Sequence, residues 1–523
     1  MKKLIFALLL MAVSASAYCV SVTEKEGGCA VTGANYTAAV DNEGNLTSLV
    51  SGGFDFARTA GKIKGKVTVK DNSATVKTDM GSLIYTFGER KIEVRCLDQD
   101  FIFTVKAPVV RTPDMRYAPM PIPVDNFRKA AFLGGDACLI CDGFIFHRTG
   151  LLANDDLIPL CVNHCTLTLR EMTASERYEL DRYIKTPAER YSELNVYTPQ
   201  NYTVFQRKTK LDGAVKLIGS VHPGYDALKV RIAGKSLKGN IDRTINVPFD
   251  KFTGAFNEVA DTPAGGWYSV TFTAYKDGVA VKSLNLAHVG VGEVFIGAGQ
   301  SNSGNSAQYQ IIQESGMVAS FDGTYWRLAN DPQLGIHDPN RKNGSFWPAF
   351  GDAMYKKYGV PIGVASTGHG GSSIAQWLPG AKAINDRGPM FDYTVNRMKQ
   401  LGVGGFRAVL WHQGESNRGC DVDDAYNKMC RIIYSSYEAA GWRFPWFVAK
   451  VSYSPNQPND EKIRSVHQRL WDNGVALEGP DTDVLVGCMR DFGGSGIHLS
   501  PQGLEEHGKM WCECVGKYLD KIL

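Results

Sequence analysis

The stretch that decides the fold is Gly297-Ala298-Gly299-Gln300-Ser301-Asn302-Ser303-Gly304-Asn305. It follows the apolar run Glu293-Val294-Phe295-Ile296, which is typical of a buried strand. A strand that ends in Gly-x-Gly-x-Ser lets the backbone turn sharply and leaves the serine at the carboxyl end of the strand. Open α/β sheets place their chemistry at that edge. The nucleophile elbow of the α/β-hydrolases is not met, because Ser303 stands where that motif requires its last glycine.

Two further stretches also follow apolar runs, namely Trp411-His412-Gln413-Gly414-Glu415-Ser416-Asn417 and Gly496-Ile497-His498-Leu499-Ser500-Pro501. A serine nucleophile needs a base, and the base needs an orienting group. Ser301 is the predicted nucleophile and His498 the predicted base, since His498 lies between a glycine-rich turn and a capped helix. His369 and His412 compete for the role of base. A plain helix cap after a glycine turn is the alternative explanation of Ser301.

After residue 290 the pattern alternates between apolar strands and long helical segments. This alternation predicts a parallel sheet with helices on both faces. The expected strands are Val294 to Ile296, Ile362 to Ala365, Arg407 to Trp411, Trp446 to Val451 and Val484 to Met489. The expected helices are Phe346–Tyr358, Pro389–Leu401, Asp423–Ala440, Glu461–Asn473 and Pro501–Leu519.

The residues before 290 predict β-structure without a catalytic constellation. Short alternating segments with turn residues between them recur over 18–190, and longer ones over 191–290. We therefore expect a β-rich N-terminal domain of structural or glycan-contacting role, a β-sandwich, and a catalytic domain over 291–523. A length of 523 residues fits about three domains.

The first residues predict export. Lys2 and Lys3 precede an apolar run that ends at the cleavage site Ala15-Ser16-Ala17, so residues 1–17 are expected to be a signal peptide and the protein secreted or periplasmic. The net charge of +3 gives no argument for a nucleic acid partner, and no later stretch is apolar enough to predict a membrane partner. The oligomeric state stays open.

Twelve cysteines become informative in an exported chain. Disulfides or buried thiols are favoured, because export leads to an oxidising compartment. The alternative is a zinc site at Cys138, Cys141, Cys161 and Cys165, whose spacing resembles that of zinc ligands. No HExxH motif occurs, and neither a metal nor a cofactor is expected in the reaction.

Four stretches together resemble the four blocks of the SGNH-type carbohydrate esterases, and most closely the sialate O-acetylesterase and acetylxylan esterase group. These stretches are Gly299-Gln300-Ser301-Asn302, Gly370-Gly371-Ser372-Ser373-Ile374-Ala375-Gln376-Trp377, Trp411-His412-Gln413-Gly414-Glu415-Ser416 and Gly496-Ile497-His498. The resemblance covers roughly residues 290 to 520. In addition, Tyr202-Thr203-Val204-Phe205-Gln206-Arg207 resembles the opening of the β-domain that precedes the catalytic domain in sialate O-acetylesterases.

The resemblance implies a flavodoxin-like, three-layer α/β/α catalytic domain and a metal-free serine esterase without cofactor. It makes Ser301 the nucleophile and His498 the base. It also implies three oxyanion donors, which are the amides of Ser301 and Gly371 and the side chain of Gln413. The expected substrate is an acetylated glycan, with sialate O-acetylesterase activity favoured over acetylxylan esterase activity. A non-catalytic glycan-binding protein is the alternative of another class.

One departure from the family pattern leaves the orienting carboxylate open. Many SGNH hydrolases carry an aspartate three residues before the histidine, whereas this chain has Ser495 there. Glu415 is favoured, because it directly follows a buried strand, and Asp491 is the alternative. Trp377 and Arg418 are expected to line the sugar site.

Overall fold

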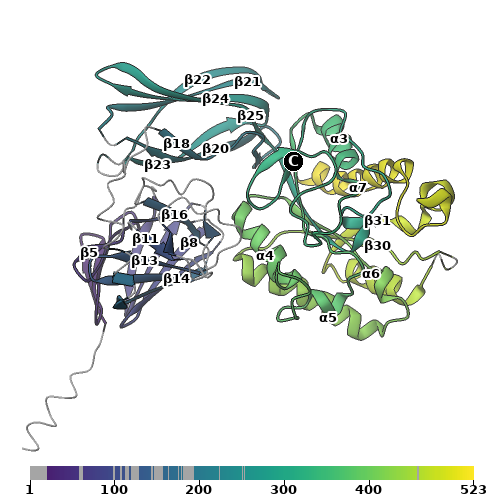
Figure 1. Cartoon of the computed structure of the whole chain (residues 1–523), viewed down its shortest axis with the longest axis horizontal. Coiled ribbons are helices and arrows are strands. Elements are labelled where there is room, and N and C mark those ends of the chain that lie inside the picture. The colour runs from purple at the N-terminus through teal and green to yellow at the C-terminus, as the bar shows by residue number, and fades with distance from the viewer. Residues whose placement is uncertain are drawn as a thin grey trace, which may run out of the picture.

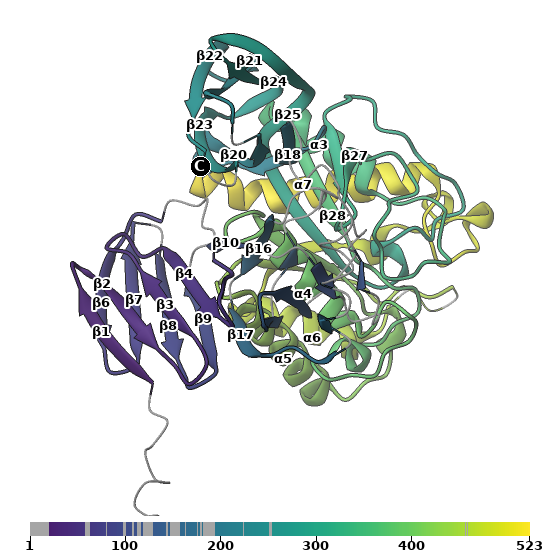
Figure 2. The same cartoon turned by 60° about the vertical axis from the view of Figure 1, so that its left-hand side comes forward.

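The computed structural model describes residues 20–523 except 58–62, 80, 98–100, 107–108, 112–116, 119–128, 143–144, 147–156, 163, 175, 178–179, 181–193, 223, 250, 252–253, 456 and 458. The expected signal peptide, residues 1–17, lies outside the described residues. Figures 1 and 2 show three parts along the chain: sheets near the N-terminus, a second group of strands, and a mixed part of helices and strands. Among the described residues, no helix is both long and apolar enough to cross a membrane.

The N-terminal part is built from antiparallel sheets. A five-stranded sheet contains β1 (Ser21–Lys25), β2 (Gly28–Thr32), β3 (Thr37–Val40), β4 (Leu46–Ser51) and β5 (Phe54–Asp55). A nine-stranded sheet contains, in spatial order, β12 (Tyr117–Ala118), β11 (Val109–Arg111), β13 (Lys129–Gly134), β14 (Ala137–Asp142), β17 (His164–Glu171), β9 (Lys91–Leu97), β8 (Gly81–Phe87), β7 (Ser73–Thr78) and β6 (Lys66–Lys70). β10 (Phe101–Lys106), β16 (Leu157–Val162) and β15 (Ile145–Phe146) form a third. The two larger sheets share one hydrophobic core, as in a sandwich.

The central part is a second sandwich, which agrees with its alternating sequence pattern. One sheet contains β18 (Leu194–Thr198), β20 (Asp212–Val221) and β23 (Ala255–Pro263). The other contains β22 (Gly239–Val247), β21 (Ala227–Ser236), β24 (Gly265–Lys276) and β25 (Val279–Gly299). Inward-facing residues of both sheets, such as Leu217 and Phe272, form one core.

Strand β25 continues from the sandwich into the mixed part. Its first half pairs antiparallel with β24, and from Glu293 onward it pairs in parallel with β28 and β29. The short strand β19 (Val204–Gln206) pairs with it at Gly290–Gly292. The boundary expected at residue 290 therefore falls inside one continuous strand, and the two parts share it.

A buried ion pair reinforces this junction. The Glu293 carboxylate is fully buried and accepts from Arg207 Nε at 2.7 Å and from Arg407 Nε at 2.8 Å. Arg207 directly follows β19, whereas Arg407 directly precedes β29. Since a buried carboxylate needs partners, this triad fixes the entry of β25 into the parallel sheet.

The mixed part contains a parallel sheet in the order β26 (Val318–Phe321), β28 (Ile362–Ser366), β25, β29 (Ala408–His412), β30 (Trp446–Lys450), β31 (Leu477–Asp481). β27 (Trp326–Leu328) pairs antiparallel with β26 at one edge. Taken without that edge pair, the five remaining strands have the order 2-1-3-4-5.

Helices pack against this sheet through two separate cores. α3 (Trp347–Tyr358) and α7 (Pro501–Ile522) share a core with Phe295 and Leu410. α4 (Met390–Leu401), α5 (Val422–Ala440) and α6 (Glu461–Asp472) share the other with Ile296 and Trp411. Neighbouring residues of a strand face opposite sides, so the two cores lie on the two faces of the sheet. All five expected helices are confirmed.

The strand expected at Val484 to Met489 was wrong. The last strand is β31, and residues 482–489 form short 3₁₀ turns, in which Val484 is 64% and Val486 48% exposed. β31 contains Pro480 and pairs only with β30, as an edge strand tolerates. The apolar residues at 484–489 therefore predicted a strand at the wrong position, since the actual strand, β31, ends at Asp481.

Two of the four cysteines with zinc-like spacing lie in the N-terminal core. Cys141 in β14 and Cys165 in β17 are buried free thiols, and burial raises the pKa of Cys165 to about 12. The side chain of Cys161 lies outside the described residues. Cys138, also in β14, is buried in a separate cluster with Leu133 and Leu180. For Cys141 and Cys165 the observed state is the buried thiol rather than a disulfide.

Candidate active site

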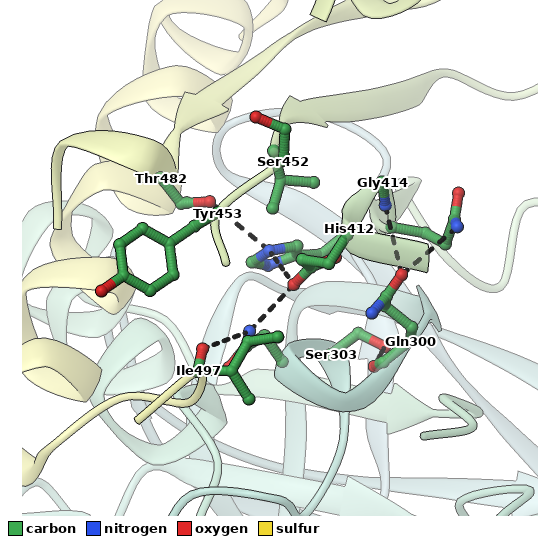
Figure 3. Close-up of polar contacts among 12 residues, drawn as sticks. Gln300, Ser303, His412, Gly414, Ser452, Tyr453, Thr482 and Ile497 are labelled. Carbon is green, nitrogen blue, oxygen red and sulfur yellow. Dashed lines mark hydrogen bonds and ion pairs between the residues drawn. The ribbon is translucent and has the colours of Figure 1, made fainter. Parts of the chain in front are cut away.

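Ser301 begins a short 3₁₀ turn, Ser301–Ser303, at the carboxyl end of β25. The turn requires Gly299, which has φ +121°, and a Cβ atom there would lie 2.2 Å from the His412 carbonyl oxygen. The Gln300 side-chain oxygen accepts from the amide of Gly414 at 3.3 Å (Figure 3). It also accepts from the amide of Ser416 at 3.1 Å. The turn that carries Ser301 is thereby tied to the loop after β29.

The three predicted blocks after β25, β28 and β29 meet at one edge of the sheet, as expected. The His369 amide, in the loop after β28, donates to the Gly299 carbonyl at 2.9 Å, and the Gln300 amide donates to the His412 carbonyl at 2.9 Å. These backbone bonds fix the neighbouring strand ends against one another. The site therefore rests on the rigid part of the domain.

Two of the three predicted oxyanion donors are available. Among the residues that the structure describes, the amides of Ser301 and Gly371 donate to no acceptor. Gly371 is exposed and has φ +69°, and no atom lies within 4 Å of the position that its Cβ would take. Unused backbone amides in the loops after β25 and β28 are the type of donor that a tetrahedral oxyanion requires.

The third predicted donor, Gln413, serves another purpose. Its side chain is fully buried, and Nε2 donates to the Ser372 carbonyl at 3.1 Å and to Asn417 Oδ1 at 2.7 Å. Both hydrogens of the amide group are thus engaged with the protein. Gln413 braces the loop that carries Gly371, which corrects the role expected for it.

His498 lies opposite Asp491 in a closed loop. The Asp491 amide donates to the His498 carbonyl at 3.0 Å, and the neighbouring residues Arg490 and Leu499 form an isolated antiparallel bridge. The Nδ1 atom of His498 lies 3.7 Å from Oδ2 of Asp491. This distance is longer than a hydrogen bond, as catalytic contacts often are in a protein without substrate.

The Asp491 carboxylate is buried, and neither of its oxygens has a hydrogen-bond partner among the described residues. Burial raises its pKa, and burial together with the charges of Arg341 and Arg490 lowers the pKa of His498 to about 4. His498 is therefore neutral near pH 7, as a general base must be. With Nδ1 facing Asp491, its other ring nitrogen remains for the nucleophile.

Asn302 connects the loops of the predicted nucleophile and base. Its Nδ2 atom donates to the carbonyl of Ile497 at 3.5 Å, next to His498, and to Oε1 of Glu415 at 2.9 Å. One side chain beside Ser301 thus contacts both other blocks. Sequence reasoning missed Asn302, although its place directly after the serine was a signal.

Glu415, which the sequence favoured as the orienting carboxylate, lies in a different environment. Its Oε1 atom is 3.7 Å from Nε2 of His412, and burial raises its pKa to about 7. His412 also faces Thr482, with 3.4 Å between Nε2 and Oγ1 (Figure 3), and its burial lowers its pKa to about 3. The contacts of His498 favour Asp491, so the order of preference is reversed.

The other competitor for the base, His369, is held by a second imidazole. Its Nδ1 atom lies 2.8 Å from Nδ1 of His337, whose Nε2 atom lies 2.8 Å from the Gly388 carbonyl oxygen. A carbonyl accepts only from N–H, so the proton of His337 is on Nε2 and that of His369 is on Nδ1. His369 is therefore anchored in the loop that leads to Gly371.

Of the two residues expected to line the sugar site, Trp377 is buried in the core and Arg418 is held between two loops. Trp377 is 1% exposed, donates from Nε1 to Ser372 Oγ at 2.9 Å and packs against Trp411. Arg418 donates to the carbonyls of Ser452 and Asn459 and to Gln457. Trp377 belongs to the core below the loop, and Arg418 ties two loops together.

Two arginines that the sequence did not single out lie near the base. Arg490 is 3% exposed, donates to the carbonyls of Thr482, Leu485 and Ile497, and stacks over the Tyr453 ring. Arg341 is half-exposed, with Nε 3.6 Å from Oδ2 of Asp338. Among the described residues, no group of three or more His, Cys, Asp or Glu side chains is placed to hold a metal ion.

Comparison with known proteins agrees with the family suggested by the motifs. A family model described as carbohydrate esterase, sialic acid-specific acetylesterase, matches residues 291–514. Among solved structures, a carbohydrate acetylesterase from Xanthomonas citri is 17% identical, covers 62% of this chain and 74% of its own, and has a TM-score of 0.41. A protein from Arabidopsis thaliana is 19% identical, covers 44% of this chain and 99% of its own, and has a TM-score of 0.34.

No curated protein matches the chain. The matched segment begins in the carboxyl half of β25, ends within α7, and contains every loop that forms the candidate site. Residues 291–514 therefore belong to the family of carbohydrate esterases described as sialic acid-specific acetylesterases.

Proposed function

We propose that the protein is a carbohydrate O-acetylesterase of the sialate O-acetylesterase type, with Ser301, His498 and Asp491 as its catalytic residues. The observation that carries the proposal is the closed loop in which His498 faces the buried Asp491 carboxylate at 3.7 Å. Asn302 joins this loop to the residue after Ser301. The unused amides of Ser301 and Gly371 supply the complementary oxyanion donors.

The reaction follows from these positions. Ser301 Oγ attacks the acetyl carbonyl carbon while its proton moves to His498, and the amides of Ser301 and Gly371 hold the oxyanion. Collapse of the intermediate breaks the bond to the sugar oxygen, which takes the proton from His498. Water, deprotonated by His498, then releases acetate and restores the serine. Asp491 stabilises the imidazolium in both steps.

The charge at the rim of the site favours an acidic sugar over neutral xylan. The Arg341 side chain is 46% exposed, and its Nε atom lies 3.4 Å from the position that a Cβ atom of Gly370 would take. It therefore lies beside Gly371, and its charge acts on His498. Arg341 is paired with Asp338 at 3.6 Å, but its guanidinium is half-exposed, so its remaining N–H groups support binding of a carboxylate on the sugar.

Two further expectations belong to the same proposal. The strand order 2-1-3-4-5 and the helices on both faces support an SGNH-type, three-layer catalytic domain. The pattern of residues 1–17 supports a secreted or periplasmic enzyme.

The test measures acetate release from O-acetylated sialic acid and from acetylated xylo-oligosaccharide, with Ser301→Ala as the control. We expect release from the sialic acid at the higher kcat/KM and none by the variant. Preference for the xylo-oligosaccharide would assign the acetylxylan esterase alternative. No release from any acetyl ester would leave a non-catalytic glycan-binding protein.

A further inference from the structure

Phe492 stands out on the surface beside the candidate site. It directly follows Asp491, its side chain is 64% exposed, and its φ is +49°. A bulky residue is rare in this left-handed region, where glycine or asparagine would meet less strain. Among the described aromatic side chains, none makes a ring contact with it. Its ring thus adds little to the packing of the fold while its backbone is strained.

The backbone around Phe492 is held in this conformation from both sides. The Phe492 amide donates to Oε1 of Gln308 at 3.2 Å, and its carbonyl accepts from Oγ of Ser495 at 2.8 Å. The ring is therefore presented by an ordered turn. This turn belongs to the same loop, residues 491–498, that positions the catalytic pair.

The surface next to this turn is also apolar. Val484 and Val486 are both exposed, and a Cβ atom at Gly494 would lie 2.9 Å from the carbonyl oxygen of Gly487. The turn that carries the two valines therefore touches the loop that carries Phe492. An exposed apolar strip beside a catalytic pair is typical of a ligand-contacting surface.

The chemistry of the proposed reaction determines what lies over this strip. The sugar oxygen leaves with a proton from His498, so the sugar ring must lie on the His498 side of the acetyl group. A pyranose ring presents a face of C–H groups that stacks on an aromatic ring, and its hydroxyl groups remain around the edge. Phe492 is the aromatic residue of the loop 491–498, which also carries His498. Its ring is therefore the one on which the C–H face of the sugar would stack.

We propose that Phe492 is a specificity-determining residue that stacks against the pyranose ring carrying the scissile acetyl group. This inference rests on the proposed function, because it assigns the position of the leaving sugar. Phe492 binds the sugar and takes no part in the proton transfers. Its loss therefore weakens binding of ring-bearing substrates more than it weakens hydrolysis of small acetyl esters.

The experiment compares Phe492→Ala, Phe492→Trp and wild type on an O-acetylated sialic acid and on ethyl acetate. Ethyl acetate is preferred to an aryl acetate, because an aryl leaving group would itself stack on Phe492. For Phe492→Ala we expect the ratio of kcat/KM for the sugar to that for ethyl acetate to fall about 3- to 10-fold, mainly through KM. Phe492→Trp should keep the ratio within about 2-fold, because it keeps an aromatic face.

Controls separate stacking from a structural effect. Tyr434→Ala removes an exposed aromatic ring on α5 and should leave the ratio as in wild type. The double variant Ser301→Ala/Phe492→Trp should change its tryptophan fluorescence when the deacetylated sugar is added. The single variant Ser301→Ala should not show this change. If Phe492→Ala lost kcat/KM equally on both esters, or kept the wild-type KM for the sugar, this inference would be overturned while the proposed function would stand. Failure of wild type to release acetate from any glycan would overturn the proposed function and this inference with it.

Discussion

Replacing Asp491 by asparagine tests the central contact of the site, because the change keeps the volume of the side chain and removes its charge. The Asp491 and His498 side chains are 1% and 17% exposed, and Oδ2 lies 3.7 Å from Nδ1. At an effective dielectric constant of about 20, unit charges at this distance attract by about 4 kcal/mol. This attraction exists only when His498 is protonated, as in the transition state, so its loss predicts a fall in kcat of about 10³-fold.

The same variant should leave the fold intact. In the part of the chain that the structure describes, both carboxylate oxygens of Asp491 lack hydrogen-bond partners, so removing the buried charge leaves no partner unsatisfied. We therefore expect the midpoint of urea unfolding to stay constant or to rise. Steady-state hydrolysis of ethyl acetate and urea unfolding together distinguish loss of chemistry from loss of structure.

Glu415→Gln is the matched control, because it also neutralises a buried carboxylate near the serine. A glutamine oxygen still accepts from Nδ2 of Asn302, whose bond to Glu415 is 2.9 Å long. Its loss of activity should be about 10-fold or less, on the scale of one altered hydrogen bond. The reasoning is refuted if Glu415→Gln loses about 10³-fold and Asp491→Asn keeps near-normal activity.

Gly496→Ala disturbs the same pair without changing either residue. A Cβ atom at position 496 would lie 1.6 Å from Oδ1 of Asp491, so the carboxylate has to move. We expect a loss of activity in the same direction as in Asp491→Asn. Ser495→Ala, in the same loop, should have a much smaller effect. Among the described residues, the Ser495 hydroxyl donates to the Phe492 carbonyl oxygen and not to Asp491 or His498.

Three further predictions concern the nucleophile, the junction and the pH dependence. Ser301→Ala should lower kcat by about 10³-fold or more with unchanged unfolding, and near-normal turnover would contradict its role. Glu293→Gln should lower the free energy of urea unfolding by about 3–5 kcal/mol, because it leaves Arg207 and Arg407 without their carboxylate. Unchanged stability would contradict the role of this triad at the junction. Burial lowers the pKa values of His412 and His467 to about 3, well below the usual histidine value of about 6.5. The unfolded chain thus binds more protons, and these two histidines alone should lower the stability by up to about 3 kcal/mol per pH unit below pH 6. The lowered pKa of His498 adds to this effect, and the raised pKa of Glu415 partly offsets it. Constant thermal unfolding between pH 7 and pH 4.5 would contradict this reasoning.

The sequence was sufficient to predict which edge of the sheet carries the site. Apolar runs of strand length alternate with amphipathic helices, and each candidate block follows such a run, as the loops after β25, β28 and β29 do. This worked because parallel strands present their carboxyl ends at one edge whatever the details of packing. The same local signal failed at Val484, where apolar residues proved to be exposed in turns.

The roles of individual side chains were harder to predict, since they depend on burial and on partners distant in sequence. A tryptophan after a glycine-rich loop is compatible with a sugar platform and with a core residue. Only the packing of Trp377 against Trp411 decides for the core. Likewise, Gln413 has the donor group that an oxyanion requires, but the Ser372 carbonyl and Asn417 already use it.

The choice between Glu415 and Asp491 shows why the sequence between two residues can mislead. Asp491 is seven residues before His498, and glycines at 493, 494 and 496 made this loop look hard to order. The bond from the Asp491 amide to the His498 carbonyl and the bridge from Arg490 to Leu499 bring the two ends of the loop together. The side chains of Asp491 and His498 therefore lie close to each other where the loop closes. The missing side chain at 496 provides the space that the carboxylate fills. The glycines therefore allow the compact turn that brings Asp491 and His498 together, and the same turn leaves Phe492 exposed beside them.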